Sequence, residues 1–235
     1  SGVSEGAGIS GCTNSGTIFF GHETGKTVAQ TVQLRVGGIV GTIKTNTTIA
    51  NCTNNGLIQY TGDASLITWF GIGGIVGYVD QNLVINNWIN TGTIEVGPTK
   101  PAKGQTEHTA SGKTVADGFR VGVGGLIGLE NSSAQYSLSC TGTNSNSGTI
   151  KIRKALAPTD TKNNNFAFVG GCIGCWRNNG IGGQTYTFTN TGDISVQSKN
   201  EKGEYVTDIP NVAAGGIIGP TAAGSGANNA IFNNC

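Results

Sequence analysis

The chain has 235 residues, of which 40 are glycine, and only 11% are charged, with a formal net charge of +1. So few charged residues argue against solvated helices, which need Glu, Lys and Arg on their outer faces. The balanced charge gives no electrostatic basis for binding nucleic acid or an anionic membrane, and no apolar run is long enough for a membrane span.

A glycine-rich motif occurs five times along the chain. It reads VGGIVG at 36–41, IGGIVG at 72–77, VGGLIG at 123–128, VGGCIG at 169–174 and AGGIIG at 214–219. A polar motif such as NCTNNGLI, at 51–58, accompanies it in each unit. Repeats of this length mark an architecture in which each unit packs mainly on its neighbours.

Within each unit the residues indicate short strands separated by turns. Apolar residues stand two apart, as in Ile94 and Val96, and turn pairs such as Asn55-Gly56 follow within a few residues. The predicted fold is all-β: a parallel β-helix, or β-solenoid, of about five coils that forms one domain over residues 1–235. Five turn glycines share a repeat position, where we expect a positive φ: Gly16, Gly56, Gly92, Gly148 and Gly192.

An asparagine precedes the turn in most units. Such a position predicts a structural ladder, because side-chain amides on stacked coils can pair with one another. The expected members are Asn14, Asn54, Asn90 and Asn190.

Insertions interrupt the units at one place, between the Gly-x-Ile strand and the next Gly-Gly strand. They span 21–35, 61–70, 97–120, 153–166 and 197–211. Because each interrupts the same corner, we expect loops along one edge of the solenoid. This loop edge is the first candidate for binding a surface glycan or a protein ligand.

The Gly-Gly-Ile-Val-Gly cores, each followed by an Asn-rich strand and a Gly-x-Ile strand, resemble GLUG-motif repeats. The resemblance covers nearly the whole chain. It implies a β-solenoid of the kind found in large bacterial surface and secreted proteins, including adhesin-like ones. It carries over no catalytic residue, and Cys172 and Cys175 depart from the usual aliphatic pattern.

Six residues share one repeat position that accepts cysteine, tryptophan and phenylalanine. This pattern predicts a buried ladder of Cys12, Cys52, Trp88, Cys140, Phe188 and Cys235. Cys12 and Cys52 lie on adjacent coils, where a disulfide is geometrically allowed; redox compartment and side-chain direction decide whether it forms.

Cys172 and Cys175 have a Cys-x-x-Cys spacing, which zinc sites and redox motifs also use. No second pair accompanies them, and the two histidines, His22 and His108, stand in other units. Cys172 takes the place of Ile39 and its equivalents, which favours core packing. The sequence therefore predicts no metal and no cofactor.

No cluster of carboxylates or Ser-His-Asp set can be assembled, so we expect a non-enzymatic protein. The alternative is a carbohydrate-active β-helix, a polysaccharide lyase or hydrolase, or a glycan-binding module, which rests on fold analogy alone. A second alternative is recognition of ice or another crystalline surface by threonine columns. Ile89 interrupts one column, and Leu57 and Asp193 interrupt the other.

Three Asn-x-Ser/Thr sequons, at Asn46, Asn51 and Asn131, are candidate glycosylation sites if the protein is eukaryotic and secreted.

The chain begins and ends within a repeat unit. We expect either a segment of a longer chain or a subunit that stacks head to tail on copies of itself. The predicted function is a structural or adhesive element, extracellular or on a cell surface, that forms fibres when it stacks.

Overall fold

The computed structural model describes residues 8–20, 32–60, 67–97, 120–130, 138–155, 166–176, 185–199, 205–206, 212–219 and 231–232. These residues form strands and turns and include no helix, so the predicted all-β class is confirmed. Within the same ranges no helical segment could cross a membrane.

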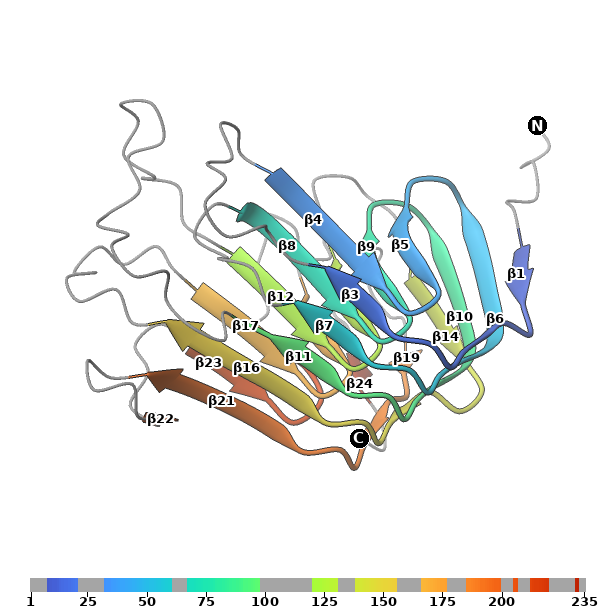
Figure 1. Ribbon diagram of the computed structural model, residues 1–235. Helices are drawn as coiled ribbons and strands as arrows, with labels where there is room; N and C mark the ends of the chain where they lie inside the picture. The colour runs from blue at the N-terminus through green and yellow to red at the C-terminus, as the bar shows by residue number, and fades with distance from the viewer. Residues whose placement is uncertain are drawn as a thin grey trace.

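The strands form four sheets, here named A to D, and one further pair (Figure 1). Sheet A contains β1 (Gly8–Ser10), β2 (Thr13–Asn14), β6 (Thr47–Asn54), β10 (Leu83–Asn90), β14 (Leu138–Thr141), β15 (Ser145–Asn146) and β20 (Thr189–Asn190). Sheet B contains β3 (Ile18–Phe20), β7 (Ile58–Tyr60), β11 (Ile94–Val96), β16 (Ile150–Ala155), β21 (Ile194–Lys199) and β22 (Tyr205–Val206).

Sheet C contains β4 (Val32–Gly37), β8 (Ile67–Gly73), β12 (Arg120–Gly124), β17 (Phe166–Gly170) and β23 (Val212–Gly215). Sheet D contains β5 (Val40–Ile43), β9 (Val76–Val79), β13 (Ile127–Glu130) and β18 (Ile173–Cys175). The separate pair joins β19 (Thr185–Tyr186) to β24 (Ile231–Phe232).

The chain visits sheets A, B, C and D in that order, and each circuit adds one coil. Sheet C has five strands, one from each circuit, and the predicted coil number is therefore confirmed. All pairings between successive coils are parallel, and the antiparallel contact of β22 with β21 lies within the fifth coil. Stacked coils place equivalent residues side by side, as in the column Ile18, Ile58, Ile94, Ile150 and Ile194.

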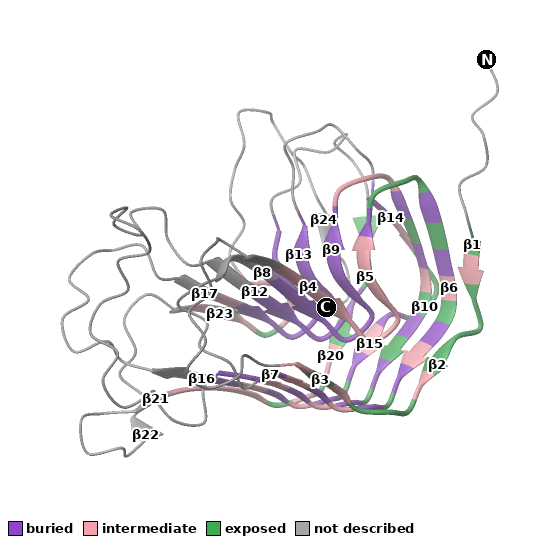
Figure 2. Ribbon diagram, turned by 45° about the horizontal axis from the view of Figure 1, so that its top comes forward, coloured by how far each residue is buried: buried purple, intermediate pink, exposed green. Residues whose placement is uncertain are grey.

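Most of the buried side chains lie in two cores. One fills the space between sheets B and C, with Ile58, Ile94 and Ile150 facing Ile72, Val123 and Val169, all fully buried. The other lies between sheets A and D and includes Ile49, Ile85, Trp88, Leu126 and Phe188. Each buried aliphatic side chain contributes about 1.5–3 kcal/mol, so stacked apolar columns are the main stabilising feature. Figure 2 shows these two double layers and the buried strands of the middle coils.

The two repeated motifs meet where the double layers join. A Cβ added to Gly38 or Gly74 would come within 2.7 Å of the carboxamide of Asn54 or Asn90, respectively. The second glycine of each Gly-Gly pair therefore lies flat against the asparagine of the polar motif. This contact explains why both motifs recur together in every unit.

The predicted positive φ of the turn glycines is wrong. None of the five has a φ in the left-handed region; the described glycines that do are Gly11, Gly97 and Gly142. Glycine is required at Gly56 for a different reason: a Cβ there would collide with the backbone oxygen of Gly16 in the preceding coil. Close approach of the stacked backbones, and not backbone conformation, selects glycine at this turn.

A left-handed residue bends sheet A halfway along each of the first four coils. Asn51 and Asn87 have φ of 52° and pair in register, and glycine takes the same position at Gly11 and Gly142. Asn and Gly are the residues that adopt this conformation at least cost. The bend turns the strand without breaking the stack.

The predicted insertions all fall between a strand of sheet B and a strand of sheet C. Their described ends belong to these strands: residues 32–35 lie in β4, 67–70 in β8, 153–155 in β16 and 197–199 in β21. The chain therefore leaves and re-enters the solenoid along one edge, as expected. The remainder of each insertion lies outside the described residues.

Candidate functional site

The predicted asparagine ladder is a continuous chain of side-chain hydrogen bonds at the end of sheet A. Asn14 Nδ2 donates to Asn54 Oδ1 at 2.7 Å, and Asn54 Nδ2 donates to Asn90 Oδ1 at 2.7 Å. Asn90 Nδ2 donates to Asn146 Oδ1 at 2.6 Å, and Asn146 Nδ2 donates to Asn190 Oδ1 at 2.7 Å. The three middle carboxamides are fully buried.

Asn146 is the member that the sequence prediction missed. The fourth unit was aligned on Cys140, and its extra residues hid the asparagine. Counting back two residues from the turn glycine identifies it, because Asn146 precedes Gly148 as Asn90 precedes Gly92.

Each carboxamide also bonds to its own turn, which fixes its orientation. Asn146 Nδ2 donates to Gly148 O at 3.0 Å, while Gly148 N donates to Asn146 Oδ1 at 3.2 Å. Asn190 makes the same two contacts with Gly192. Four of the five carboxamides, Asn14, Asn54, Asn90 and Asn146, donate to the next coil toward the C-terminus, so the ladder has one direction.

The predicted buried ladder of cysteine and aromatic residues needs two corrections: Cys12 is exposed, and Cys140 lies at another register position. Cys52 and Trp88 pair in register and are fully buried, and Phe188 is buried in the same core. Cys140, in contrast, pairs with Ile85. Cys140 is thus equivalent to a residue three places before Trp88, and since Asn146 pairs with Asn90, the bend between them holds one extra residue.

Asn144 takes the place predicted for Cys140. It is 2% exposed, and its Oδ1 accepts a hydrogen bond of 3.0 Å from the backbone N of Trp88. Its Nδ2 donates to Thr141 O at 3.0 Å. The buried Asn144 carboxamide thus links the bend of the fourth coil to the third coil. Cys235 lies outside the described residues.

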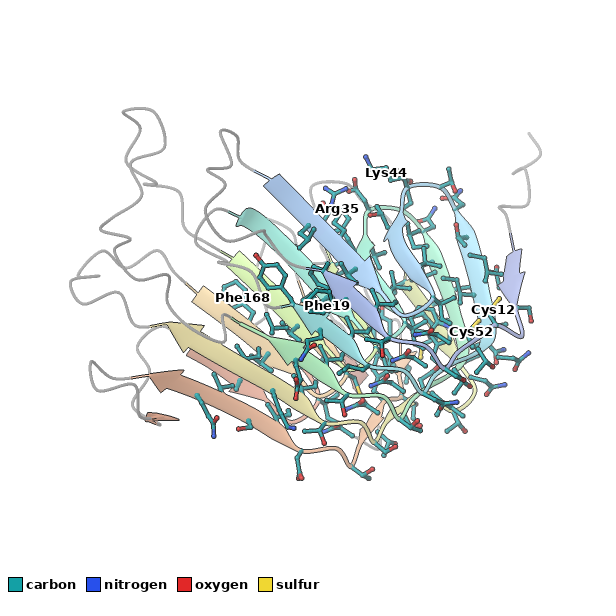
Figure 3. The ribbon with its side chains drawn as sticks, in the orientation of Figure 1. Cys12, Phe19, Arg35, Lys44, Cys52 and Phe168 are labelled. Carbon is teal, nitrogen blue, oxygen red and sulfur yellow. The ribbon has the colours of Figure 1, made fainter. Side chains whose placement is uncertain are left out.

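Cys12 and Cys52 lie next to each other on adjacent coils (Figure 3). Both are free thiols in this structure, with Cys12 exposed and Cys52 buried. Burial is the main cause that raises the pKa of the Cys52 thiol; a hydrogen bond to the backbone of Cys12 lowers this pKa, and the Cys12 thiol raises it. The two thiols lie side by side, and a disulfide between them stays a prediction.

Cys172 and Cys175 face different cores. Cys172 lies between sheets A and D, whereas Cys175 packs with Tyr78 and Leu129 in a small third cluster. Both are buried, and core packing accounts for each of them. No group of three metal-ligating side chains occurs within the described ranges.

Two of the three sequon asparagines are described, and both are exposed. Asn46 Oδ1 accepts a bond from Asn82 Nδ2 at 2.9 Å, and Asn51 Oδ1 accepts one from Asn87 Nδ2 at 3.0 Å. Each carboxamide therefore forms a short ladder on the surface of sheet A. Asn131 lies outside the described residues.

A buried polar cluster lies between sheets A and D near the fourth coil. Glu130 is fully buried at the end of β13. The pKa of Tyr186 is raised, mainly because the side chain is buried and secondly because Glu130 lies nearby. The Tyr186 hydroxyl donates to Leu138 O at 2.9 Å, and its ring packs edge-on against Trp176. The cluster is enclosed by core side chains, so we assign it to packing.

Sheets A and B differ in the chemistry of their outer faces. On sheet B, Gln59 Nε2 donates to Glu95 Oε2 at 2.9 Å, and Lys151 Nζ lies 3.3 Å from Glu95 Oε1. The described segments of sheet A and its turns, 8–16, 47–56, 83–92, 138–148 and 185–192, contain no Asp, Glu, Lys, Arg or His. The molecule thus presents one charged face and one uncharged face.

Two columns of exposed or half-exposed side chains flank the asparagine ladder on this uncharged face. The first column is Thr13, Thr53, Ile89, Ser145 and Thr189. The second is Ser15, Asn55, Thr91, Ser147 and Thr191. We name the two columns together the outer triplet face, because each coil contributes the first and third residues of a triplet centred on a ladder asparagine.

No known protein family, curated protein or solved structure matches this chain.

Proposed function

We propose that this protein is a non-enzymatic, extracellular or cell-surface β-solenoid that serves as a structural or adhesive element and stacks head to tail. The similarity of its repeats to GLUG-motif repeats supports the surface setting. The loop edge is the proposed contact for a surface glycan or protein ligand. The stacking proposal rests on one observation, the direction of the asparagine ladder.

The two ends of the ladder are complementary. Asn14 Oδ1 accepts only from Gly16 N among the described contacts, whereas every inner carboxamide oxygen also accepts from the preceding coil. Asn190 Nδ2 donates to Gly192 O, and among the described residues no asparagine of a further coil accepts its second hydrogen. A second copy stacked on the fifth coil would place its Asn14 oxygen opposite this donor.

The first coil also leaves apolar surface uncovered. Ile18 and Val36 are only partly buried, whereas their equivalents Ile58 and Ile72 in the next coil are fully buried. Covering such side chains is favourable by roughly 25 cal/mol per Å² of apolar surface. Stacking would continue the same columns across the joint.

The strand β24 sets a condition on this stacking. It pairs with β19, outside sheet A, and thereby adds a strand beyond the fifth coil, where the β1 strand of an incoming copy would also lie. Either β24 or the incoming β1 must therefore leave this position for the two copies to stack. A chain shortened after residue 230 is therefore expected to stack more readily than the full chain.

Glycines at the two ends allow a test that spares the fold. A Cβ on Gly216 meets nothing within 4 Å, and a Cβ on Gly16 meets only its own Asn14 at 3.7 Å. At the equivalent inner positions, Gly171 and Gly56, a Cβ would collide with the backbone of the neighbouring coil. Gly16→Ala and Gly216→Ala should therefore leave the monomer intact and block the joint.

The measurement is electron microscopy and sedimentation of the wild type, the two variants and Gly8→Ala. Gly8 has no neighbour within 4 Å and occupies an outward-facing column, so it is the matched control. We expect fibres from the wild type and Gly8→Ala, and single particles from the other two. Fibres formed equally by all four proteins, or by none, would contradict head-to-tail stacking.

A further inference from the structure

We propose that the outer triplet face binds ice. This face is distinct from the solenoid ends and from the loop edge, and the proposal does not depend on stacking. It starts from the geometry of the two columns and from the absence of charge around them.

The face is a regular grid. Successive coils repeat each position about every 4.8 Å, and the two columns stand two residues, or about 6.6 Å, apart along the strand. Eight of the ten positions are Thr or Ser, and the others are Asn55 and Ile89. The Ile89 side chain that interrupts the first column is 39% exposed, so the grid continues through it as an apolar position.

The grid is held rigidly from beneath and along its surface. The middle residue of every triplet is a ladder asparagine, bonded both to its own turn and to an adjacent coil, as Asn90 is to Gly92 and Asn146. On the surface, Thr91 Oγ1 donates to Asn55 Oδ1 at 2.7 Å. Side chains fixed in this way lose little conformational entropy on binding.

The chemistry of the face excludes most other partners. A charged ligand would find no counter-charge, because the described segments of sheet A carry none. Protein hot spots rely on buried aromatic residues or arginine, and neither type occurs in the two columns. What remains is an uncharged, periodic partner that offers hydrogen-bonding groups in two dimensions.

Ice is such a partner. Its faces present oxygen atoms in ordered rows, each able to donate and accept a hydrogen bond, as threonine and serine hydroxyls can. Ordered water bridges polar groups nearly as well as a direct hydrogen bond, and water already fixed in a lattice loses no further freedom. A charged side chain would lose hydrating water on contact with a solid surface, at a cost in free energy, so an uncharged face is better suited to such contact.

The outer face of sheet B serves as the internal contrast. It has the same strand spacing but carries Glu95 and Lys151 as an ion pair, with exposed Asp193 near the turn. Its exposed apolar residue, Phe19, is 63% accessible, and Figure 3 shows it apart from Cys12 and Cys52 of sheet A. Phe19 therefore provides a control for a change at Ile89.

The test compares wild type, Ile89→Lys and Phe19→Lys, each shown by circular dichroism to retain the strand spectrum. Each is labelled with a fluorophore and partitioned between a slowly growing ice hemisphere and the liquid, and growth of single ice crystals is followed in parallel. We expect incorporation into ice and arrest of crystal faces for wild type and Phe19→Lys, and loss of both for Ile89→Lys. Exclusion of the wild type from ice would overturn the proposal, as would incorporation unaffected by Ile89→Lys.

Crystalline cellulose and chitin are included as other uncharged solids. Retention on either that is lost in Ile89→Lys, together with exclusion from ice, would assign the face to a solid polysaccharide and would refute the ice proposal.

Discussion

Replacing Asn90 by alanine tests whether the ladder is a principal source of stability. Asn90 is fully buried and makes three side-chain hydrogen bonds, to Asn54, Asn146 and Gly92. Each bond contributes about 0.5–1.5 kcal/mol, and the buried groups that lose a partner each carry a desolvation cost of about 1–3 kcal/mol. We therefore expect Asn90→Ala to lower the free energy of unfolding by about 3–5 kcal/mol.

The matched control is Asn14→Ala at the end of the same ladder. Asn14 is half-buried and reaches solvent, so water can replace its bonds to Asn54 and Gly16. Its expected cost is about 1 kcal/mol. Urea unfolding, followed by the fluorescence of the buried Trp88 and by circular dichroism, measures both changes.

An isosteric variant gives a second signature. Asn90→Asp keeps the shape but replaces the donor with an acceptor, which then faces the acceptor Oδ1 of Asn146. Ionisation of a buried aspartate is costly, so the variant should regain stability as the pH falls and the carboxyl becomes protonated. Equal losses for Asn90→Ala and Asn14→Ala, with no recovery of Asn90→Asp in acid, would refute this account of the ladder.

Three further outcomes are expected. Gly125→Ala should destabilise the monomer by several kcal/mol, roughly the cost of overpacking a core, because its Cβ would collide with the Gly171 oxygen. Gly216→Ala, at the same position of the motif, should leave stability unchanged. Thermal unfolding at low protein concentration compares the two variants. Oxidation should join Cys12 to Cys52, and the reaction should be slow at neutral pH because the pKa of Cys52 is raised. The disulfide closes a loop of 40 residues (52 − 12) and should raise the free energy of unfolding by about 4 kcal/mol. Mass spectrometry detects the bond and urea unfolding measures its effect; an unchanged unfolding midpoint in the crosslinked form would contradict this prediction. The pKa of Tyr186 is raised in the folded state, which favours the neutral side chain. Its contribution to the free energy of unfolding is therefore complete below about pH 10 and is lost as the pH rises further. Tyr186→Phe should reduce this loss of stability at alkaline pH, and an unchanged dependence of stability on pH would count against the prediction.

The coil architecture could be predicted from the sequence because one turn of the solenoid is one repeat of the chain. Every circuit must place an apolar side chain in each core, and this requirement is visible as the repeated motifs around Ile58 and Ile94. The role of the glycines was not visible in the same way. A turn glycine can serve a positive φ or a close backbone approach, and only the contact between Gly56 and the Gly16 carbonyl oxygen decides between them.

Register was the other point at which the sequence was insufficient. Cys140 resembles Cys52 in its local sequence, but an insertion of four residues can be absorbed on either side of it. The structure pairs Leu138 and Cys140 with Leu83 and Ile85, three residues before Trp88, so only one extra residue follows Cys140. The outer triplet face was seen in the sequence only as interrupted columns, since exposure of Ile89 cannot be read from its residue type.

The bulge of the fourth coil shows where this fold can accept additional chain. The ladder continues at Asn146 with a bond of 2.6 Å, because the bend at Gly142 accommodates the one extra residue and leaves Thr143 exposed. The same bend exists at Asn51 and Asn87, on the same side of the molecule and one rung apart. Peptides grafted at these bends would be displayed at strand spacing along an unchanged scaffold, which makes the corner a natural site for presenting ordered arrays of binding sequences.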